Sequence, residues 1–194
     1  MVFCFIRNSF ARYSVLRRIT GAIFFLPLPY SLVEYGFVVQ QVNGISMQPT
    51  LNPDLSKQRD VVLFDRFSIT TLRHYRRGDI VMVRSPYDPK RIYVKRLIAL
   101  PGDVVETLAP YPQKKVTVPE GHCWIEGDRS MDSEDSNTLG PLPLALIEAR
   151  LVTVIMPFTR ALEWARGWGA QTGTIRSKGI VERVKERKEN WSES

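Results

Sequence analysis

Residues 92–103 read IYVKRLIALPGD, and this stretch decides the fold class. Its first seven residues are mostly β-branched, aromatic or apolar, as in a strand, and its last four are turn-forming. Turn signals of the same kind lie at 77–79, 85–86 and 119–121. They separate six further short apolar runs, at 61–64, 80–83, 104–107, 116–118, 123–125 and 151–156. This spacing predicts a mainly β domain of antiparallel strands, with a short helical turn within 141–149.

The composition is typical of a globular chain. The 194 residues are 44% hydrophobic and 24% charged, which excludes a mainly disordered chain and a polytopic membrane protein. Two cysteines exclude a disulfide-dense secreted scaffold. The two cysteines and two histidines do not show the spacing of zinc ligands, because only His122 and Cys123 lie near one another, and we expect neither a metal nor a cofactor.

The net charge of +7, from 27 basic and 20 acidic residues, is concentrated at the two ends of the chain. Residues 1–33 carry four arginines and no acid, and residues 176–194 carry six basic and four acidic residues. The residues between them, with 17 basic and 16 acidic side chains, are nearly neutral. Apart from a short cluster at 73–77, no basic stripe with interleaved aromatic residues occurs, so we expect no nucleic-acid partner.

The N-terminus has the pattern of a targeting segment followed by a membrane anchor. Residues 1–18 are rich in arginine and lack acids, as mitochondrial targeting regions do. Residues 19–39 carry a single charge, Glu34, and as a helix they would span about 31 Å, close to the thickness of a bilayer. We therefore predict one N-terminal transmembrane helix.

Two features qualify this anchor. Pro27 and Pro29 would bend or break a helix, and the stretch 19–33 also fits a signal peptide, although no small-residue cleavage site follows it. Arg17 and Arg18 precede the apolar segment and would keep the N-terminus on the matrix side, sending the rest of the chain across.

Two sites could carry chemistry. Ser46 lies in a loop beside Gly44 and before Pro49, which favours extended local backbone, although serine in such a loop is usually a turn residue. Side chains alternate between the faces of a strand, so one of the adjacent cations Lys95 and Arg96 must lie near a buried surface. A desolvated lysine favours its neutral amine, which could activate a serine hydroxyl, whereas on an edge strand Lys95 would reach solvent.

Four segments together resemble the conserved boxes of type I signal peptidases, peptidase family S26. These segments are 46–50 (SMQPT), 77–81 (RGDIV), 93–103 (YVKRLIALPGD) and 127–140 (GDRSMDSEDSNTLG). They occur in the family's order within residues 44–140, a range of about half of the chain. The resemblance implies a signal-peptidase-like antiparallel β domain with a Ser46–Lys95 dyad: Ser46 as nucleophile and Lys95 as general base.

The resemblance also implies supporting roles near the dyad. Ser133 would orient the Lys95 amine, and Asp135 would brace the last box by pairing with a cation. The oxyanion hole would include the backbone N–H of Ser46. Met47 and Pro49 would lie against the substrate.

Two positions depart from the family pattern. Gly44 stands where bacterial members often place a hydroxyl donor, which leaves the second oxyanion contact open. Asn137 replaces the usual arginine partner of Asp135, for which we considered Arg129 or Arg96 as substitutes.

The same resemblance favours the branch of the family that acts at the mitochondrial inner membrane. The run DSNTLGP, at 135–141, is typical of that branch. It implies cleavage of sorting segments from precursor proteins at the outer face of the membrane, with release into the intermembrane space. It further implies contact with inner-membrane lipid and a hetero-oligomer with a sister subunit.

These predictions divide the chain into four parts. Residues 1–18 form a targeting segment, 19–39 the anchor, 40–160 the catalytic β domain and 161–194 a charged tail. Within the tail, 180–191 has apolar residues spaced for a short amphipathic helix, although a solvated tail fits its composition equally well.

Three alternatives remain open at this point. One is a secretory or bacterial-type signal peptidase, and another is a non-catalytic scaffold subunit, which would have no need of both Ser46 and Lys95. A basic membrane- or RNA-binding module is the third, and its binding would weaken steeply with salt.

Overall fold

The computed structural model describes residues 35–54, 58–129, 134–166 and 184–185. The chain divides into two compact units, Met1–Phe37 and Val38–Ser194. The fold described below is that of the second unit, which contains the four family-like segments.

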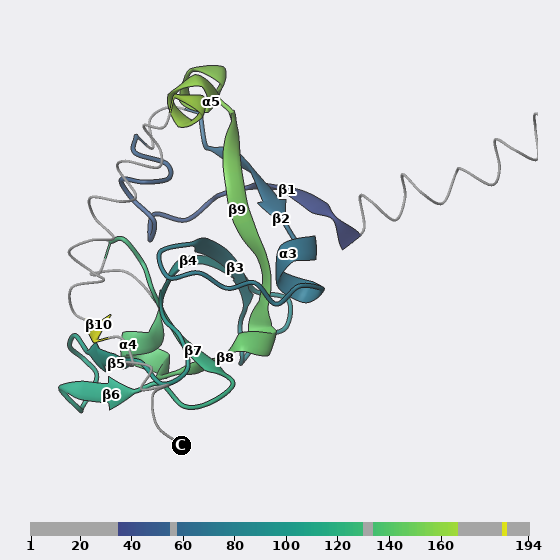
Figure 1. Ribbon diagram of the computed structural model, residues 1–194. Helices are drawn as coiled ribbons and strands as arrows, with labels where there is room; N and C mark the ends of the chain where they lie inside the picture. The colour runs from purple at the N-terminus through teal and green to yellow at the C-terminus, as the bar shows by residue number, and fades with distance from the viewer. Residues whose placement is uncertain (1–34, 55–57, 130–133, 167–183, 186–194) are drawn as a thin grey trace, which may run out of the picture. The chain divides into compact units, whose positions relative to one another are not determined.

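A seven-stranded antiparallel sheet is the main feature of the fold (Figure 1). Its spatial order is β1-β2-β9-β3-β4-β7-β8, so the long penultimate strand β9 inserts between β2 and β3. The strands are β1 (Phe37–Gln41), β2 (Val61–Asp65), β3 (Ile80–Arg84), β4 (Ile92–Ala99), β7 (His122–Glu126), β8 (Leu142–Pro143) and β9 (Ile147–Met156). The prediction of a mainly β, antiparallel domain is therefore confirmed.

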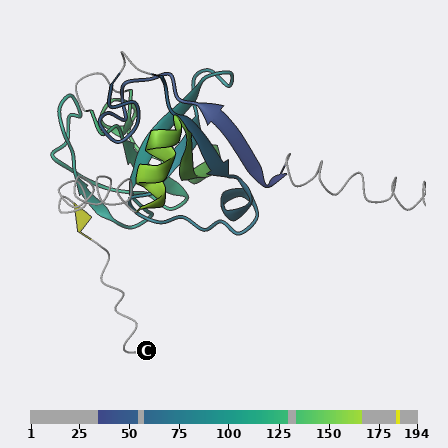
Figure 2. The ribbon, with the colours of Figure 1, turned by 90° about the horizontal axis from the view of Figure 1, so that it is seen from above.

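A second sheet of three short strands has the order β10-β5-β6. It consists of β5 (Val104–Glu106), β6 (Lys115–Thr117) and β10 (Val184–Lys185). Val105, Val118 and Trp124 form a buried cluster with Ile98 and Ala99 of β4, which joins this sheet to the main one. Figure 2 shows the fold from above.

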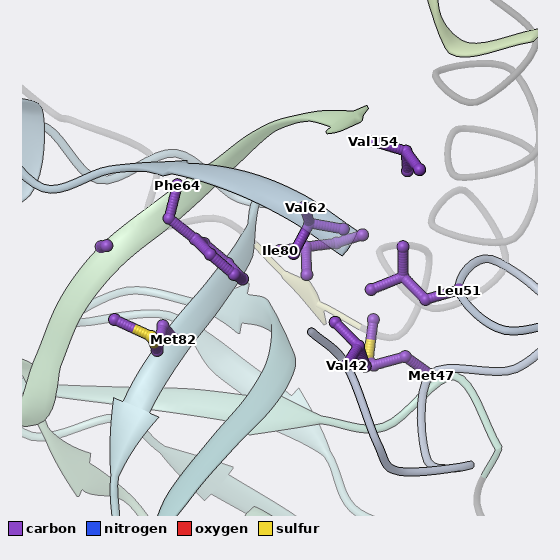
Figure 3. Packing of buried hydrophobic residues seen from close by; sticks show 9 residues of the cluster. Val42, Met47, Leu51, Val62, Phe64, Ile80, Met82 and Val154 are labelled. Carbon is purple, nitrogen blue, oxygen red and sulfur yellow. The ribbon is translucent and has the colours of Figure 1, made fainter. Parts of the chain in front are cut away.

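The first four residues of β3, 80–83, are all apolar, and side chains on both faces of the strand are buried. Ile80 and Met82 belong to one hydrophobic cluster, whereas Val81 and Val83 belong to another. The first cluster also receives Met47 and Leu51 from a loop outside the sheet, and Figure 3 shows these two side chains close to Val42. This packing positions the loop that carries Ser46.

Three short helices and one 3-10 turn complete the described part. They are α3 (Phe67–Thr70), α4 (Ser136–Leu139), η2 (Leu144–Leu146) and α5 (Phe158–Ala165). The turn η2 lies where a helical turn was predicted within 141–149. Helix α5 follows β9 directly, and its Trp164 packs against the first hydrophobic cluster.

Each predicted apolar run lies in a strand or overlaps one, with two differences in extent. β9 begins at Ile147, four residues before its predicted start, because its first half alternates buried and half-buried residues instead of forming an apolar run. Strand β1 begins at Phe37, so the last three residues of the predicted anchor, 37–39, are extended.

The predicted anchor and tail fall mostly outside the described residues. Residues 19–34 and 186–191 are not described, and within the described ranges no helix is long and apolar enough to cross a membrane. Val184 and Lys185 pair with Val105 and Val104 of β5, so at these two positions the chain is a strand and the predicted helix is wrong.

Candidate active site

Ser46 lies in a tight turn that follows β1. The backbone N–H of Gln48 donates to Ile45 O at 3.0 Å, and that of Leu51 donates to Met47 O at 2.9 Å. Met47 and Leu51 are 1% and 0% exposed, so the turn is anchored in the core on both sides of Pro49. The prediction of extended backbone before Pro49 is wrong, because these local hydrogen bonds curl residues 46–50 into a turn.

A buried amide–carboxylate pair holds the two ends of this turn together. The backbone N–H of Asn52 donates to Asp60 Oδ2 at 2.9 Å, and that of Asp60 donates to Asn52 Oδ1 at 2.8 Å. Asn52 Nδ2 donates to the carbonyls of Val42 and Gly44, at 2.7 and 3.1 Å. Asn52 has a φ of 50°, a left-handed conformation that asparagine adopts more readily than most residues.

Lys95 lies in the middle of β4 and is 3% exposed. Burial lowers the pKa of its amine, and the negative charges of Asp135 and Glu134 oppose that shift. Its Nζ lies 6.0 Å from the centroid of the Tyr93 ring, two residues earlier on the same strand. Tyr93 is held in turn by its hydroxyl, which donates to Glu134 Oε2 at 2.6 Å.

Ser46 and Lys95 line the same cleft, which has a volume of about 230 Å³. One wall comes from the end of β1 and the chain leading to the turn, and the other from the first half of β4. The lining residues are Gln40, Gln41, Val42, Asn43, Gly44, Ser46, Met47, Ile92, Tyr93, Val94 and Lys95. The cleft therefore combines a hydroxyl with a desolvated amine, which is the combination that nucleophilic catalysis by serine needs.

The β4 wall of this cleft has an open backbone edge. Residues 92–96 pair with β3 on one side, whereas the pairing of β4 with β7 begins only at Arg96. No strand of the described sheet pairs with residues 92–94 on the β7 side. Such an edge can accept an extended peptide as an additional strand.

Arg96, the neighbour of Lys95, is also 3% exposed but is paired. Its Nε and Nη2 donate to the two oxygens of Asp128 at 2.8 and 2.7 Å, and Nη1 donates to Gly78 O at 2.8 Å. Thr50 Oγ1 donates to Asp128 Oδ2 at 2.5 Å, which links this pair to the serine turn. The suggestion that Arg96 compensates for Asn137 is wrong, because its guanidinium is committed to Asp128.

Asp135 lies in the last family-like segment and caps α4. Its carboxylate accepts from the backbone N–H groups of Asn137, at 3.0 Å, and Gly127, at 3.2 Å. Asn137 Nδ2 also donates to Asp135 Oδ1 at 3.3 Å and to Glu126 Oε1 at 3.1 Å. The asparagine itself therefore supplies the side-chain donor that an arginine would give at this position.

The last segment also contacts the serine turn. The backbone N–H of Arg129 donates to Ser46 O at 2.9 Å, and its Nη1 donates to Gln48 Oε1 at 2.9 Å. Both hydrogen bonds therefore connect Arg129 to the turn that carries Ser46. Sequence reasoning missed this contact because residues 48 and 129 are linked by no local pattern.

The remaining predicted site residues are placed as follows. Gly44 lies beside Ser46, since a Cβ at this position would be 3.9 Å from Ser46 Oγ. Met47 lines the cleft, whereas Pro49 is exposed and is not among the lining residues. Ser133 lies outside the described residues.

No metal site is formed within the described ranges, where no group of three His, Cys, Asp or Glu is suitably arranged. Cys123 is a free, buried thiol, and burial raises its pKa to about 12. At neutral pH this thiol is protonated and unreactive, as expected for a small core residue.

Comparison with known proteins places these features in a wider context. The model of the family described as signal peptidase, peptidase S26, matches residues 15–110. Over 160 residues the chain is 39% identical to the mitochondrial inner membrane protease subunit 2 of Danio rerio, covering 82% of this chain and 85% of that protein. The human mitochondrial inner membrane protease subunit 1 is 38% identical over 131 residues, which is 65% of this chain and 74% of that protein. A crystal structure of signal peptidase I from Enterococcus faecalis aligns with a TM-score of 0.35 and 25% identity, over 41% of this chain and 97% of that one.

Proposed function

Because this chain belongs to the signal peptidase family, peptidase S26, we propose that Ser46 is its nucleophile and Lys95 its general base. The chain is a serine endopeptidase of the signal peptidase type. One observation carries the assignment of the pair: Ser46 shares a cleft with a buried lysine whose pKa is lowered by desolvation.

The chemistry follows from this pair. The neutral Lys95 amine takes the hydroxyl proton as Ser46 Oγ attacks the scissile carbonyl carbon. The ammonium then protonates the leaving amine as the peptide bond breaks, which leaves an ester on Ser46. Water, deprotonated by the same amine, attacks that ester and releases the carboxylate product, with Ser46 regaining its proton.

The supporting residues act on this amine and on the oxyanion. Ser133 accepts a hydrogen bond from the Lys95 ammonium or donates to the free amine, and so orients it. Asp135 holds the segment that bears Ser133 by capping α4. The backbone N–H of Ser46 stabilises the oxyanion, and such a donor contributes about 3 kcal/mol to transition-state binding.

The substrate binds as an extended strand along the open edge of β4. Its backbone pairs with residues 92–94, and its side chains lie against the walls of the cleft, which Met47 helps to line. Pro49, on the exposed side of the turn, contacts the chain beyond the cleft. The small cleft favours small side chains next to the scissile bond.

We further propose that this enzyme works at the mitochondrial inner membrane. A single span within 19–39 anchors it, with the catalytic domain in the intermembrane space. Its substrates are precursor proteins whose sorting segments end at that face of the membrane. Its partner is inner membrane protease subunit 1, in keeping with the names of its relatives.

The test compares mitochondria that contain the wild-type chain with mitochondria that contain Ser46→Ala. Intermembrane-space precursors should accumulate in uncleaved form with Ser46→Ala, while the variant protein remains in the membrane at its normal level. Thr71→Ala, which removes an exposed hydroxyl from a residue outside the cleft, is the matched control and should process normally. Normal processing by Ser46→Ala would exclude Ser46 as the nucleophile.

A further inference from the structure

One charged side chain of helix α5, that of Arg160, contacts the end of the serine turn at Thr50. Arg160 Nη2 donates to Thr50 O at 2.7 Å and to Asp60 Oδ2 at 3.2 Å. The Arg160 side chain is 20% exposed and that of Asp60 is 2% exposed, so this contact is shielded from water. The residues it joins are separated by at least 100 positions in the sequence.

Arg160 extends the hydrogen-bonded pair that holds the turn. Asp60 Oδ2 accepts from Arg160 and also from the backbone N–H of Asn52, whose side chain in turn holds the carbonyls of Val42 and Gly44. The start of the segment is thus tied through Asn52, and its end is tied directly at the Thr50 carbonyl. Ser46 lies between these two points.

The helix is itself fixed to the sheet. Trp164, one turn after Arg160, packs against the hydrophobic cluster that includes Met47 and Leu51. Arg160 Nη1 donates to Glu163 Oε2 at 3.3 Å, which orients the guanidinium along the helix. The direction of the Arg160 fork is therefore set by packing on one side and by hydrogen bonds on the other.

Apolar contacts and hydrogen bonds constrain the turn in different ways. Burial of Met47 and Leu51 fixes how deep the turn lies, but hydrophobic contacts have no preferred direction. Hydrogen bonds to Thr50 O and Asp60 are directional, and they fix the rotation of the turn. A displacement of about 1 Å at a reacting atom can lower a rate about 100-fold.

We propose that Arg160 is a positioning residue for the nucleophile, holding the serine turn so that Ser46 Oγ meets the Lys95 amine. This inference rests on the proposed function of Ser46 and Lys95. It assigns a role in catalysis to the segment after β9, at the boundary of what the sequence predicted to be the tail. Arg160 hydrogen-bonds to Thr50, Asp60 and Glu163, none of which lines the cleft, so its loss should affect kcat more than KM.

The experiment compares Arg160→Met with Arg160→Lys and Arg166→Met in the full chain purified in detergent. Arg166 lies at the end of the same helix and is exposed, which makes Arg166→Met the matched control. Cleavage of a precursor peptide is measured well below the unfolding temperature of each variant, with the folded fraction determined separately. We expect Arg160→Met to lower kcat about 10- to 100-fold with KM within about twofold. Arg160→Lys should recover part of the rate, because lysine keeps the charge but not the fork, and Arg166→Met should match the wild type.

A second comparison keeps the test decisive if Arg160→Met does not fold. Asp60→Asn removes the charge that Arg160 pairs with, and it should lower kcat in the same way. If both residues act through one network, Arg160→Met combined with Asp60→Asn should cost no more than the larger single loss. The proposal is overturned if Arg160→Met keeps kcat within twofold of wild type. Where Arg160→Met does not fold, the same result with Asp60→Asn overturns it. It is also overturned if the losses in kcat of the two single variants are additive in the double variant. Activity in Ser46→Ala would instead contradict the proposed function itself.

Discussion

Lys95 and Arg96 are adjacent on β4, but their surroundings act on the two cations in opposite ways. Lys95 and Arg96 are equally buried, at 3% exposed. Arg96 meets both oxygens of Asp128 and stays charged, as arginine does even in protein interiors. Lys95 has a lowered pKa, because the loss of hydration outweighs the nearby charges of Asp135 and Glu134. Arginine stays charged whatever its surroundings, so Arg96 forms a structural ion pair, whereas burial makes it easier for Lys95 to lose its proton, as the proposed base must.

The largest contrast is expected from the same substitution at the two positions. Lys95→Met removes the proposed general base, so kcat/KM should fall about 10²- to 10⁴-fold. Its free energy of unfolding should stay the same or rise, because methionine carries no group that resists burial. Peptide cleavage and urea unfolding measure the two effects. A folded Lys95→Met that cleaves at the wild-type rate would contradict the role of Lys95.

Arg96→Met should act mainly on stability. It leaves the buried Asp128 carboxylate without its main partner, so the free energy of unfolding should drop by about 3–5 kcal/mol. Urea unfolding tests this, and Asp128→Asn added to Arg96→Met should restore part of the loss. A decrease of less than about 1 kcal/mol in the single variant would show that the pair is not the structural element we describe.

A substitution in the cleft that Lys95 lines should also be able to raise activity. A serine at position 44 fits beside the nucleophile, because its Cβ would lie 3.9 Å from Ser46 Oγ. Gly44→Ser would offer a hydroxyl donor to the oxyanion and should raise kcat by up to about tenfold without changing stability. A lower kcat in a stably folded Gly44→Ser would mean that the oxyanion forms elsewhere.

The smallest effect should come from Glu134. Its negative charge raises the pKa of Lys95, so Glu134→Gln should lower that pKa. The neutral amine then persists to lower pH, and the acidic limb of kcat/KM against pH should move to lower pH. Glu106→Gln, on the small sheet, is a control of the same chemistry and should leave the limb in place. A shift of the limb to higher pH in Glu134→Gln would reverse the sign we assign.

The sequence predicted most of the sheet because the strands are apolar runs between turns. Residues 80–83 of β3 are buried on both faces, so their apolar side chains are continuous and easily recognised. The first three residues of β1, 37–39, were assigned to the anchor because hydropathy alone does not distinguish an apolar strand from the end of a membrane helix. The first half of β9 alternates buried and half-buried residues and therefore gave no apolar run.

The site was predicted only as far as local pattern allowed. Ser46 and Lys95 stand in short segments whose residue types identify them. The residues that hold the serine turn could not be found in this way. Asn52 and Asp60 pair through the fold, and Arg160 reaches Asp60 across 100 residues of sequence. Arg96 was one of two arginines considered as a partner of Asp135, and it pairs with Asp128 because β4 and β7 lie side by side.

The direct titration of the Lys95 amine tests the central claim most sharply. Heteronuclear NMR of the 15N-lysine-labelled chain, with Lys95→Arg to assign the signal, follows its protonation in the folded protein. We predict a midpoint below the ordinary lysine value of 10.5, because burial disfavours the ammonium. A midpoint at or above 10.5 would mean that Lys95 is a charged residue like Arg96, and it would contradict its role as the base.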